Sequence, residues 1–415
     1  MSKKKILLLS DHLMSTSGVA TQSRFLVEGL INTGRYSFVQ FGGAKKHEDY
    51  RTGRVNDDLV IKPVDGFGSR DQIRQALAIE RPDALMLFND PRFFITNVFE
   101  AEEEIHQICP IVYWHLWDNP PFPEFNRVLY DSTDLINCIN YPTYEMLKDR
   151  YPDRTHFIPH TVPPTLYRPL PHEDRVRMRE VLLGCHRKDH FIALWVSRNA
   201  RRKMPSDVIV AWSHFIKEME VKYGHRKATL IMHTDPLDME GPNLHHVLEV
   251  TDMKGSVVFS NNRVEFSDMN NLYNVADVTC AISCNEGFGL SMLESMMAGV
   301  PIIAQKTGGM TRQVINHATG EENGVALDPD VKCLVGSQFV PYIYEDYVSH
   351  KTISSAFMKM YEMGPERRHE LGLKAHDYAC SEFNLSKMID DWDRTMSDTI
   401  DNWRSRYSRW EVRSL

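Results

Sequence analysis

The sequence lacks any apolar run close to the roughly 20 residues that a membrane-spanning helix needs. The apolar stretch nearest the start, Ile6–Leu9, is too short for the core of a signal peptide and is better interpreted as a buried strand. Cysteine is also scarce: seven cysteines are scattered over 415 residues, and they form no CxxC pair. Reduced thiols are the simplest interpretation, so we expect a cytoplasmic protein.

A strong excess of one charge is absent as well. The sequence contains 48 Lys and Arg against 56 Asp and Glu, and a net charge of −8 does not favour a general nucleic-acid or membrane-surface binder. A local basic groove remains compatible with this balance, because net charge says nothing about distribution. The apolar content of 42% and the charged content of 25% are ordinary for globular proteins, and the length predicts two or three domains.

Short apolar runs alternate with helix-like segments in two successive series. Runs that are apolar throughout indicate parallel strands that helices cover on both faces. Two such series in one chain predict an α/β protein with two doubly wound, Rossmann-like lobes. The first series comprises Ile6–Leu9, Leu59–Ile61, Ala84–Phe88, Ile111–Trp114 and Leu135–Ile139, and the second comprises Phe191–Val196, Thr229–Met232, Val257–Phe259, Val278–Ile282 and Pro301–Ala304.

A proline-rich stretch separates the two series. Five prolines lie between Pro159 and Pro171, where they cannot sit inside a helix or a central strand, so they suit a stiff linker. We therefore expect one lobe at residues 1–165, a second at 166–385, and a C-terminal helix at 386–415. Three tryptophans in the C-terminal part are expected to pack a helix onto a lobe: Trp392, Trp403 and Trp410.

Two strand-to-helix turns carry residue types that suit an anion. After the first strand, small residues around Gly18 precede an amphipathic helix whose N-terminal N–H groups can approach an anion. The alternative is a turn whose glycine only satisfies a positive φ. In the second lobe, a basic run from Arg198 to Lys203 follows a strand, where open α/β sheets bind ligands, and would complement a diphosphate. The alternative is a solvated surface loop.

The most informative stretch is EGFGLSMLE, from Glu286 to Glu294. A carboxylate can accept hydrogen bonds from two sugar hydroxyls, so two acids at this spacing suit the two ends of a nucleotide sugar. A helix begins near Gly289, and its first amides can meet phosphate or sugar oxygens. The alternative is a capped βαβ unit with two surface acids, because acids are common at helix starts.

This stretch resembles the donor-site motif of the retaining glycosyltransferases of family 4, the E-x7-E enzymes with a GT-B fold. The match continues into the strand AGVPIIA and a GG pair. Four further segments agree in order: SGVATQSRFLVEGL, YWHLWDNPP, FIPHTVPPTLYRPL and WVSRNARRKMPSDVIVAW. The resemblance covers Ile6 to about Pro329. It implies two Rossmann-like lobes that face each other across a cleft, with C-terminal helices packing back on the first lobe.

The resemblance implies an enzyme that moves a hexosyl or pentosyl group from a nucleotide-diphosphate sugar to an acceptor hydroxyl with retention. The first lobe would bind the acceptor, a glycan or small molecule, and the second a UDP- or GDP-sugar. No cofactor or metal is expected, and Asp328-Pro-Asp330 is interpreted as a turn rather than a metal-binding DxD. Two alternatives stay open: a DNA-modifying glycosyltransferase acting on hydroxymethylated bases, and a non-catalytic GT-B binding or scaffold subunit.

The resemblance also implies roles for single residues. Glu286 would hold hydroxyls of the transferred sugar, and Glu294 would bind the ribose of the nucleotide. Arg198 and Lys203 would neutralise the leaving diphosphate. His115 would lie beside the sugar, although a histidine packed among aromatic neighbours is the alternative. Donor contacts through the backbone or its immediate surroundings are expected at Gly18, Phe288, Gly289 and Leu290.

Two segments of the first lobe are candidates for acceptor binding. The aromatic segment YWHLWDNPPFPEF offers Trp117 and Asp118, since aromatic rings can form a platform for a sugar or an unstacked base. Packing is the alternative for its aromatic residues. A basic loop at residues 44–54 could follow a phosphate backbone, although such loops are commonly only solvated. Its basic residues are Lys45, Lys46, Arg51 and Arg54.

The chain departs from the family pattern in three places. His160-Thr161 stands where an Asn-Gly pair is common, and residues 311–313, Thr-Arg-Gln, stand where a Glu is common after the GG pair. The segment from Asp330 to His350 looks inserted. We expect these departures to concern the acceptor, a base or a partner more than the core chemistry.

Overall fold

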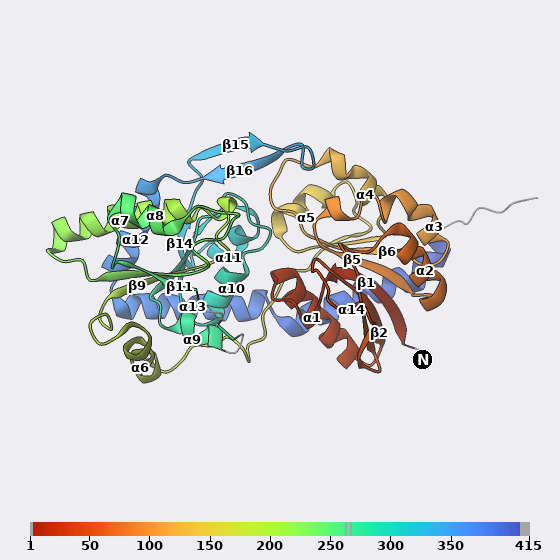
Figure 1. The fold of residues 1–415 in the computed structure, drawn as a ribbon, viewed down its shortest axis with the longest axis horizontal. Coiled ribbons are helices and arrows are strands. Elements are labelled where there is room, and N and C mark those ends of the chain that lie inside the picture. The colour runs from red at the N-terminus through yellow and green to blue at the C-terminus, as the bar shows by residue number, and fades with distance from the viewer. Residues whose placement is uncertain (1–2, 262–263, 266–267, 407–415) are drawn as a thin grey trace, which may run out of the picture. The chain divides into compact units, whose positions relative to one another are not determined.

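The computed structural model describes residues 3–261, 264–265 and 268–406 (Figure 1). The chain divides into two compact units. Unit 1 comprises Met1–His160, Gly336–Ile343 and Leu385–Leu415, and unit 2 comprises Thr161–Val335 and Tyr344–Asn384. The sequence predicted lobe boundaries after residues 165 and 385, and the units are divided after residues 160 and 384. The segment 336–343, which the sequence assigned to the second lobe, is grouped with unit 1.

Unit 1 is built on an eight-stranded sheet in the order β3-β4-β2-β1-β5-β6-β7-β8. All neighbouring strands are parallel except β3 and β4. The strands are β1 Lys4–Asp11, β2 Tyr36–Gly43, β3 Gly53–Asn56, β4 Leu59–Pro63, β5 Ala84–Phe88, β6 Ile111–His115, β7 Leu135–Cys138 and β8 Thr155–Phe157. The α-helices are α1 Gly18–Asn32, α2 Arg70–Glu80, α3 Glu102–His106, α4 Arg127–Asp131, α5 Tyr141–Lys148 and α14 Leu385–Arg406.

Unit 2 is built on a six-stranded parallel sheet in the order β11-β10-β9-β12-β13-β14. Its strands are β9 Phe191–Val196, β10 Ala228–His233, β11 Val257–Ser260, β12 Val278–Ala281, β13 Ile302–Gln305 and β14 Gly324–Leu327. Its α-helices are α6 His172–Leu183, α7 Pro205–Tyr223, α8 Leu244–Thr251, α9 Met269–Asn274, α10 Leu290–Met297, α11 Thr311–Val314, α12 His350–Glu362 and α13 Pro365–Glu382. The segment that looked inserted forms a separate hairpin of β15 Val331–Val335 and β16 Ile343–Tyr347.

Both sheets reverse their strand order beside their first strand. In unit 1 the chain runs from β1 outward through β2 to β4 and then returns to β5 on the other side of β1. In unit 2 it runs from β9 through β10 to β11 and returns to β12 on the other side of β9. Two doubly wound, Rossmann-like units are therefore confirmed, and each has a switch point at the carboxyl ends of its central strands. No described helix is long and apolar enough to cross a membrane.

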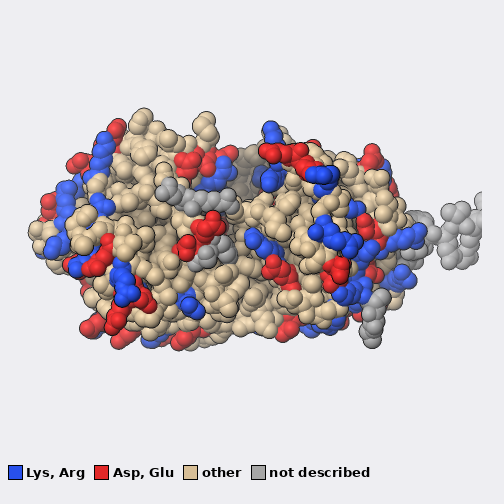
Figure 2. Space-filling view, turned by 60° about the horizontal axis from the view of Figure 1, so that its bottom comes forward, with Lys and Arg blue, Asp and Glu red and all other residues tan. Residues whose placement is uncertain are grey.

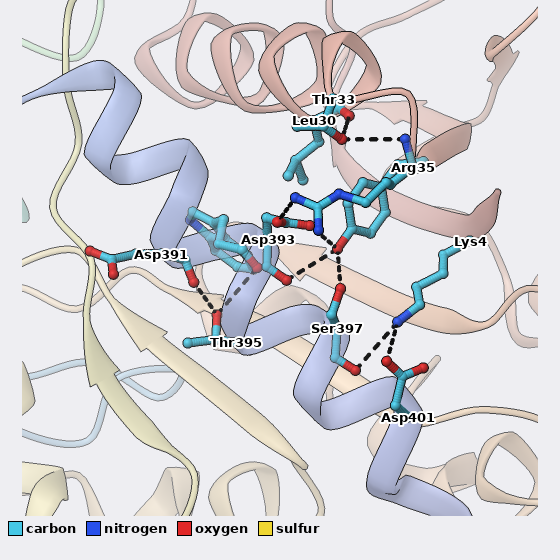
Figure 3. A network of polar contacts seen from close by, with 11 residues as sticks. Lys4, Leu30, Thr33, Arg35, Asp391, Asp393, Thr395, Ser397 and Asp401 are labelled. Atoms are coloured by element: carbon cyan, nitrogen blue, oxygen red, sulfur yellow. Dashed lines mark hydrogen bonds and ion pairs between the residues drawn. The ribbon is translucent and has the colours of Figure 1, made fainter. Parts of the chain in front are cut away.

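The C-terminal helix α14 packs on unit 1, as the sequence predicted. Trp392 and Trp403 are buried, and the Trp392 ring lies 5.3 Å from that of Trp114 on β6. Trp410 lies outside the described residues. A polar network adds to this apolar contact (Figure 3). Such a network anchors the helix at a defined position along the sheet, whereas apolar packing alone is less directional.

Asp393 is the centre of this network. Its carboxylate pairs with Arg35 and accepts a hydrogen bond of 2.8 Å from the Tyr36 hydroxyl at the start of β2. Tyr36 and Asp393 are both buried. At the rim of the network, Lys4 donates to Asp401 over 2.7 Å, but the Asp401 side chain is 64% exposed. The buried bonds should therefore contribute more to docking than the exposed pair.

We expect Asp393→Ala to loosen α14 from unit 1, because it removes the carboxylate that Arg35 and the buried Tyr36 hydroxyl share, and the hydroxyl keeps only the residue 393 carbonyl and Ser397 as partners. The predicted loss is about 2 kcal/mol in the stability of the docked helix. Hydrogen exchange of the α14 amides measures it. Asp401→Ala is the matched control and should change exchange by no more than about 0.5 kcal/mol. Equal effects of the two substitutions would contradict the role assigned to Asp393.

Candidate functional site

The switch point of unit 2 brings two loops together. One loop follows β9 and contains Arg198 and a 3₁₀ turn at Arg201–Lys203. The other follows β12 and leads through Glu286 into α10. Because β9 and β12 are adjacent parallel strands, their carboxyl ends lie at one edge of the sheet. The Lys203 ammonium accordingly donates to a Glu286 carboxylate oxygen, so the structure joins two residues that the sequence assigned to one site.

Glu286 is held as an anion. Its side chain is only 14% exposed, and it accepts a 3.1 Å hydrogen bond from the Ser283 hydroxyl. Burial by itself raises the pKa of Glu286, but Lys203 and Arg202 beside it bring the pKa below its ordinary value. The nearest Arg202 nitrogen lies 3.6 Å from the carboxylate. A fixed carboxylate with two cations beside it can accept hydrogen bonds from hydroxyl groups at neutral pH.

Two glycines allow the loop before α10 to pack closely. Gly289 has a φ of 91°, which L residues with side chains rarely adopt, and a Cβ there would lie 2.7 Å from Met310 Cγ. The Gly309 N–H, from the GG pair, donates to the Glu286 carbonyl over 3.0 Å. A Cβ on Gly309 would collide with the Phe288 backbone. The two glycine motifs of the sequence thus support one loop.

The Phe288 side chain belongs to the core rather than to a ligand surface. It is buried, and its ring lies 5.6 Å from that of Phe383. What Phe288, Gly289 and Leu290 can offer a ligand is backbone at the start of α10, as expected. The Phe288 carbonyl accepts a 2.7 Å hydrogen bond from Gln313. Gln313, one of the departures from the family pattern, therefore supports the loop.

Glu294 lies on α10 between two tyrosines. The Tyr273 hydroxyl donates to its carboxylate over 2.6 Å, and Tyr167 also bonds to it. Burial raises the pKa of Glu294 to about 7, although both tyrosine bonds act in the opposite direction. Glu294 therefore differs in kind from Glu286: it changes charge near neutral pH, whereas Glu286 stays ionised.

The basic run of the β9 loop is divided among different partners. Lys203 contacts Glu286, but Arg198 bonds to Asp238 over 2.7 and 3.1 Å and does not contact Glu286. The Arg198 side chain is 64% exposed, so a ligand can still reach it. Arg202 is the arginine beside Glu286 because the Cys284 N–H bonds to its carbonyl over 2.9 Å and joins the two loops. The sequence placed Arg202 in the basic run that suits a diphosphate but gave it no role of its own.

Arg201 receives a partner from the inserted hairpin. Glu345 on β16 is buried and pairs with Arg201 at 2.6 Å, while the Tyr347 hydroxyl donates to the same carboxylate. The next residue, Asp346, donates its N–H to the Cys284 carbonyl over 2.7 Å. The insertion therefore buttresses both loops of the candidate site. Sequence reasoning missed Glu345, because nothing in the order of residues links it to Arg201.

The switch point of unit 1 has its own polar cluster. Gly18 is exposed and begins α1, whose N-cap Ser17 accepts from the Ala20 N–H over 3.1 Å. The Ser17 hydroxyl donates to Asp11 at the end of β1. Asn89, just after β5, donates to the other Asp11 oxygen over 2.6 Å. The sequence identified Gly18 but not the two polar residues that directly follow the central strands.

His115 is enclosed by the core of unit 1. It is fully buried, its Nε2 lies 2.9 Å from the Tyr130 hydroxyl, and its ring stacks on Tyr113. Burial lowers the pKa of His115 to about 3, so the ring is neutral. A ligand cannot contact His115 in this arrangement, which is what the packed-histidine alternative expects. The reason is that β6 is covered on both faces along its whole length.

The acceptor candidates differ in exposure. Trp117 is buried, with its indole N–H donating to the Asn119 carbonyl over 2.9 Å, whereas Asp118 is partly exposed. All four basic residues of the loop at 44–54 are exposed. Arg51 pairs with Asp49 at 2.7 Å, and Arg54 lies 3.5 Å from Asp57. Only part of the loop's charge is therefore left for a partner.

The triplet at residues 328–330 connects β14 to β15, with a bend at Asp330. Asp328 is exposed and pairs with Lys306, and Asp330 accepts the Ser349 N–H over 2.7 Å next to the start of α12. The two carboxylates thus have separate partners. Over the described part of the chain, no group of three or more His, Cys, Asp or Glu side chains is arranged to hold a metal ion.

Comparisons with known proteins show what the chain is similar to. Residues 186–332 match the family model "Glycosyl transferases group 1". A segment of 203 residues is 27% identical to D-inositol 3-phosphate glycosyltransferase of Corynebacterium diphtheriae, covering 46% of this chain and 44% of that protein. The chain thus matches less than half the length of this curated relative.

Solved structures resemble the chain over nearly its whole length. Anabaena HepE in complex with UDP and glucose has a TM-score of 0.68 at 17% identity, covering 95% of this chain and 100% of that one. Sucrose-phosphate synthase from Thermosynechococcus elongatus has a TM-score of 0.68 at 17% identity, covering 97% and 99%. At this identity the likeness concerns the fold. Residues 186–332 are therefore similar to glycosyl transferases of group 1, and the chain has the GT-B fold that its sequence predicted.

Proposed function

We propose that the protein is a retaining glycosyltransferase that takes its sugar from a UDP-sugar. The observation that carries the proposal is the Lys203–Glu286 pair at the switch point of unit 2, inside the segment that matches glycosyl transferases of group 1. HepE, which shares the fold, binds UDP and glucose, and this favours UDP over GDP. A scaffold subunit would have no need of an ionised, partly accessible glutamate held between cations.

In the proposed reaction the acceptor hydroxyl oxygen bonds to the anomeric carbon as the bond from that carbon to the diphosphate breaks. The hydroxyl proton passes to the departing diphosphate, and both bonds lie on the same face of the sugar. Arg198 and Lys203 would stabilise the negative charge that develops on the diphosphate. Glu286 would orient the sugar hydroxyls, and Glu294 would accept from the ribose. The amides at the start of α10 would add donors for phosphate or sugar oxygens.

We further propose that the acceptor is a glycan or small molecule, bound by unit 1, rather than DNA. Two of the four basic residues in the loop at 44–54 lie near acids of their own loop. Trp117 is buried and so offers no face on which a flipped base could stack. Figure 2 shows acidic side chains interspersed among the basic ones on the visible face. Partly exposed Asp118 suits a hydroxyl-rich acceptor.

The proposal is tested by UDP release from UDP-sugars. We expect the purified protein to hydrolyse at least one UDP-sugar slowly, and Glu286→Gln to lower that kcat by roughly a hundredfold, because the substitution removes charge needed in the transition state. UDP itself should still bind. Glu321→Gln, an exposed glutamate of the same unit, is the matched control. Wild-type turnover in Glu286→Gln would refute the role of Glu286, and no hydrolysis or transfer with any nucleotide sugar would favour the scaffold alternative.

Removing the proposed diphosphate ligands should weaken UDP binding. Lys203→Ala and Arg198→Ala should each raise the Kd of UDP about tenfold or more, since a lost charged hydrogen bond costs roughly 1.5–3 kcal/mol. Calorimetry with UDP measures the change. Lys217→Ala, on the exposed face of α7, should leave the Kd unchanged. An unchanged Kd for Arg198→Ala alone would mean that this arginine serves only Asp238.

Glu294 should make UDP binding depend on pH. Its pKa of about 7 means that the carboxylate, the better acceptor for ribose hydroxyls, becomes the dominant form only as pH rises. If UDP selects the ionised form, its affinity should increase about tenfold between pH 6 and pH 8. The UDP phosphate also titrates near pH 6, so Glu294→Gln serves as the control, in which only that smaller dependence remains. The same pH profile in both proteins would contradict ribose binding by Glu294.

A further inference from the structure

Unit 2 has a cavity of about 1220 Å³ at the edge of its sheet opposite the candidate site. Phe191 begins β9, and Lys227 and Pro301 immediately precede β10 and β13; all three line this cavity. It therefore borders the amino ends of the parallel strands, whereas Glu286 and Lys203 follow the carboxyl ends. The two sites are separated by the length of the strands and share no residue.

The cavity lining is mainly basic. It includes six Lys or Arg side chains and four histidines, against four carboxylates. Two of these carboxylates are already committed to neighbours. Asp277 accepts the Ile192 N–H over 2.8 Å and pairs with Arg179 at 3.1 Å, and Glu362 pairs with Lys222. These pairs also use Arg179 and Lys222, so the rest of the lining has four Lys or Arg side chains against two carboxylates. One of the four, Lys188, pairs with Glu180 outside the lining. A surplus of positive charge remains, in a protein whose overall net charge is −8.

Arg368 shows that this surplus reaches the interior. It is only 8% exposed, yet its Nε has no hydrogen-bond partner, while Nη1 donates to the Met360 and Tyr361 carbonyls over 3.0 and 3.1 Å. Its contact with Asp277 is long, at 3.4 Å. A buried guanidinium with an unsatisfied N–H is costly unless an acceptor completes it. This points to an anion in the cavity.

Two further residues extend the positive wall. Arg175 lies 3.4 Å from His369, and burial together with Arg179 and Arg368 lowers the pKa of Arg175. Lys227 is exposed at the rim and makes no ion pair within the described part of the chain. Because both buried and exposed cations line the same cavity, it suits a ligand that carries several negative charges. A concave wall favours a small molecule over a membrane surface, and the rings of Tyr223 and Tyr361 offer apolar contact.

We propose that this cavity binds a soluble small molecule that carries two or more phosphate groups, at a site separate from that of the donor. The site has no role in bond making. It lies at the ends of α7 and α12, the helices that cover the sheet carrying the donor loops. The proposal does not depend on the proposed glycosyltransferase activity, because the lining residues and those of the donor site are different.

Inorganic tripolyphosphate, titrated by calorimetry without divalent cations, tests the proposal. We expect it to bind the full-length protein in the presence of saturating UDP. Lys227→Glu and Lys188→Glu, both at the cavity, should each weaken that binding at least fivefold, and the double variant more than tenfold. Lys351→Glu, at the other end of α12, is the matched control for charge and should change the affinity less than twofold.

Equal weakening by Lys227→Glu and Lys351→Glu would overturn the proposal, because general attraction would then explain binding. Tripolyphosphate binding that UDP abolishes and that Lys203→Ala weakens at least as much as Lys227→Glu does would also overturn it, because the binding would then belong to the donor site. Vesicles of phosphatidylglycerol provide a further experiment. If the protein binds these vesicles and tripolyphosphate does not compete with that binding, the ligand is a membrane surface and the small-molecule proposal is overturned. Thermal melting of each variant shows whether it folds. If Lys227→Glu does not fold, Lys188→Glu still tests the proposal.

Discussion

The ion pair between Lys203 and Glu286 is the interaction on which the candidate site depends. It exists because the strand order of unit 2 reverses between β9 and β12, so that two loops far apart in sequence leave the sheet side by side. Each partner alone would be a costly charge in a mostly enclosed place, and together they fix the position of both loops. The glycines Gly289 and Gly309 serve a different contact, since side chains there would separate the loop before α10 from the loop after β13.

The strands that could be predicted from the sequence are those that consist of an unbroken run of apolar residues. Ala84–Phe88 and Phe191–Val196 were predicted with the bounds that β5 and β9 have. Strand β2 was missed because Gln40 interrupts its apolar run, although this residue is fully buried and donates to Ser10 and the Asp11 carbonyl. A buried polar side chain is satisfied by tertiary partners, which a single sequence does not reveal.

Tertiary contacts also limited what could be predicted of the candidate site. Glu286, Glu294 and the glycines lie in one motif, so their local geometry was predictable from spacing. Arg202 and Glu345 gain their places only through contacts between loops and with the inserted hairpin. The enclosure of His115 was equally hidden, because a histidine at a strand end can face a ligand or the core, and the sequence is compatible with both.

The hairpin of β15 and β16 contributes to the candidate site. Its Glu345 pairs with Arg201, and this determines which cations lie beside Glu286. With Glu345 neutralising Arg201, the charges closest to Glu286 are those of Lys203 and Arg202. An unpaired Arg201 would compete for the same carboxylate or for the ligand. Because Glu345 is buried, its pair with Arg201 is costly to break, since breaking a buried pair leaves an uncompensated charge.

The cations of unit 2 thus fall into three groups. Some are neutralised by structural ion pairs, some hold Glu286, and others, at the opposite edge of the sheet, remain in excess around a cavity. This excess affects stability, because positive charges gathered without counter-charges repel one another and disfavour the folded state unless an anion neutralises them.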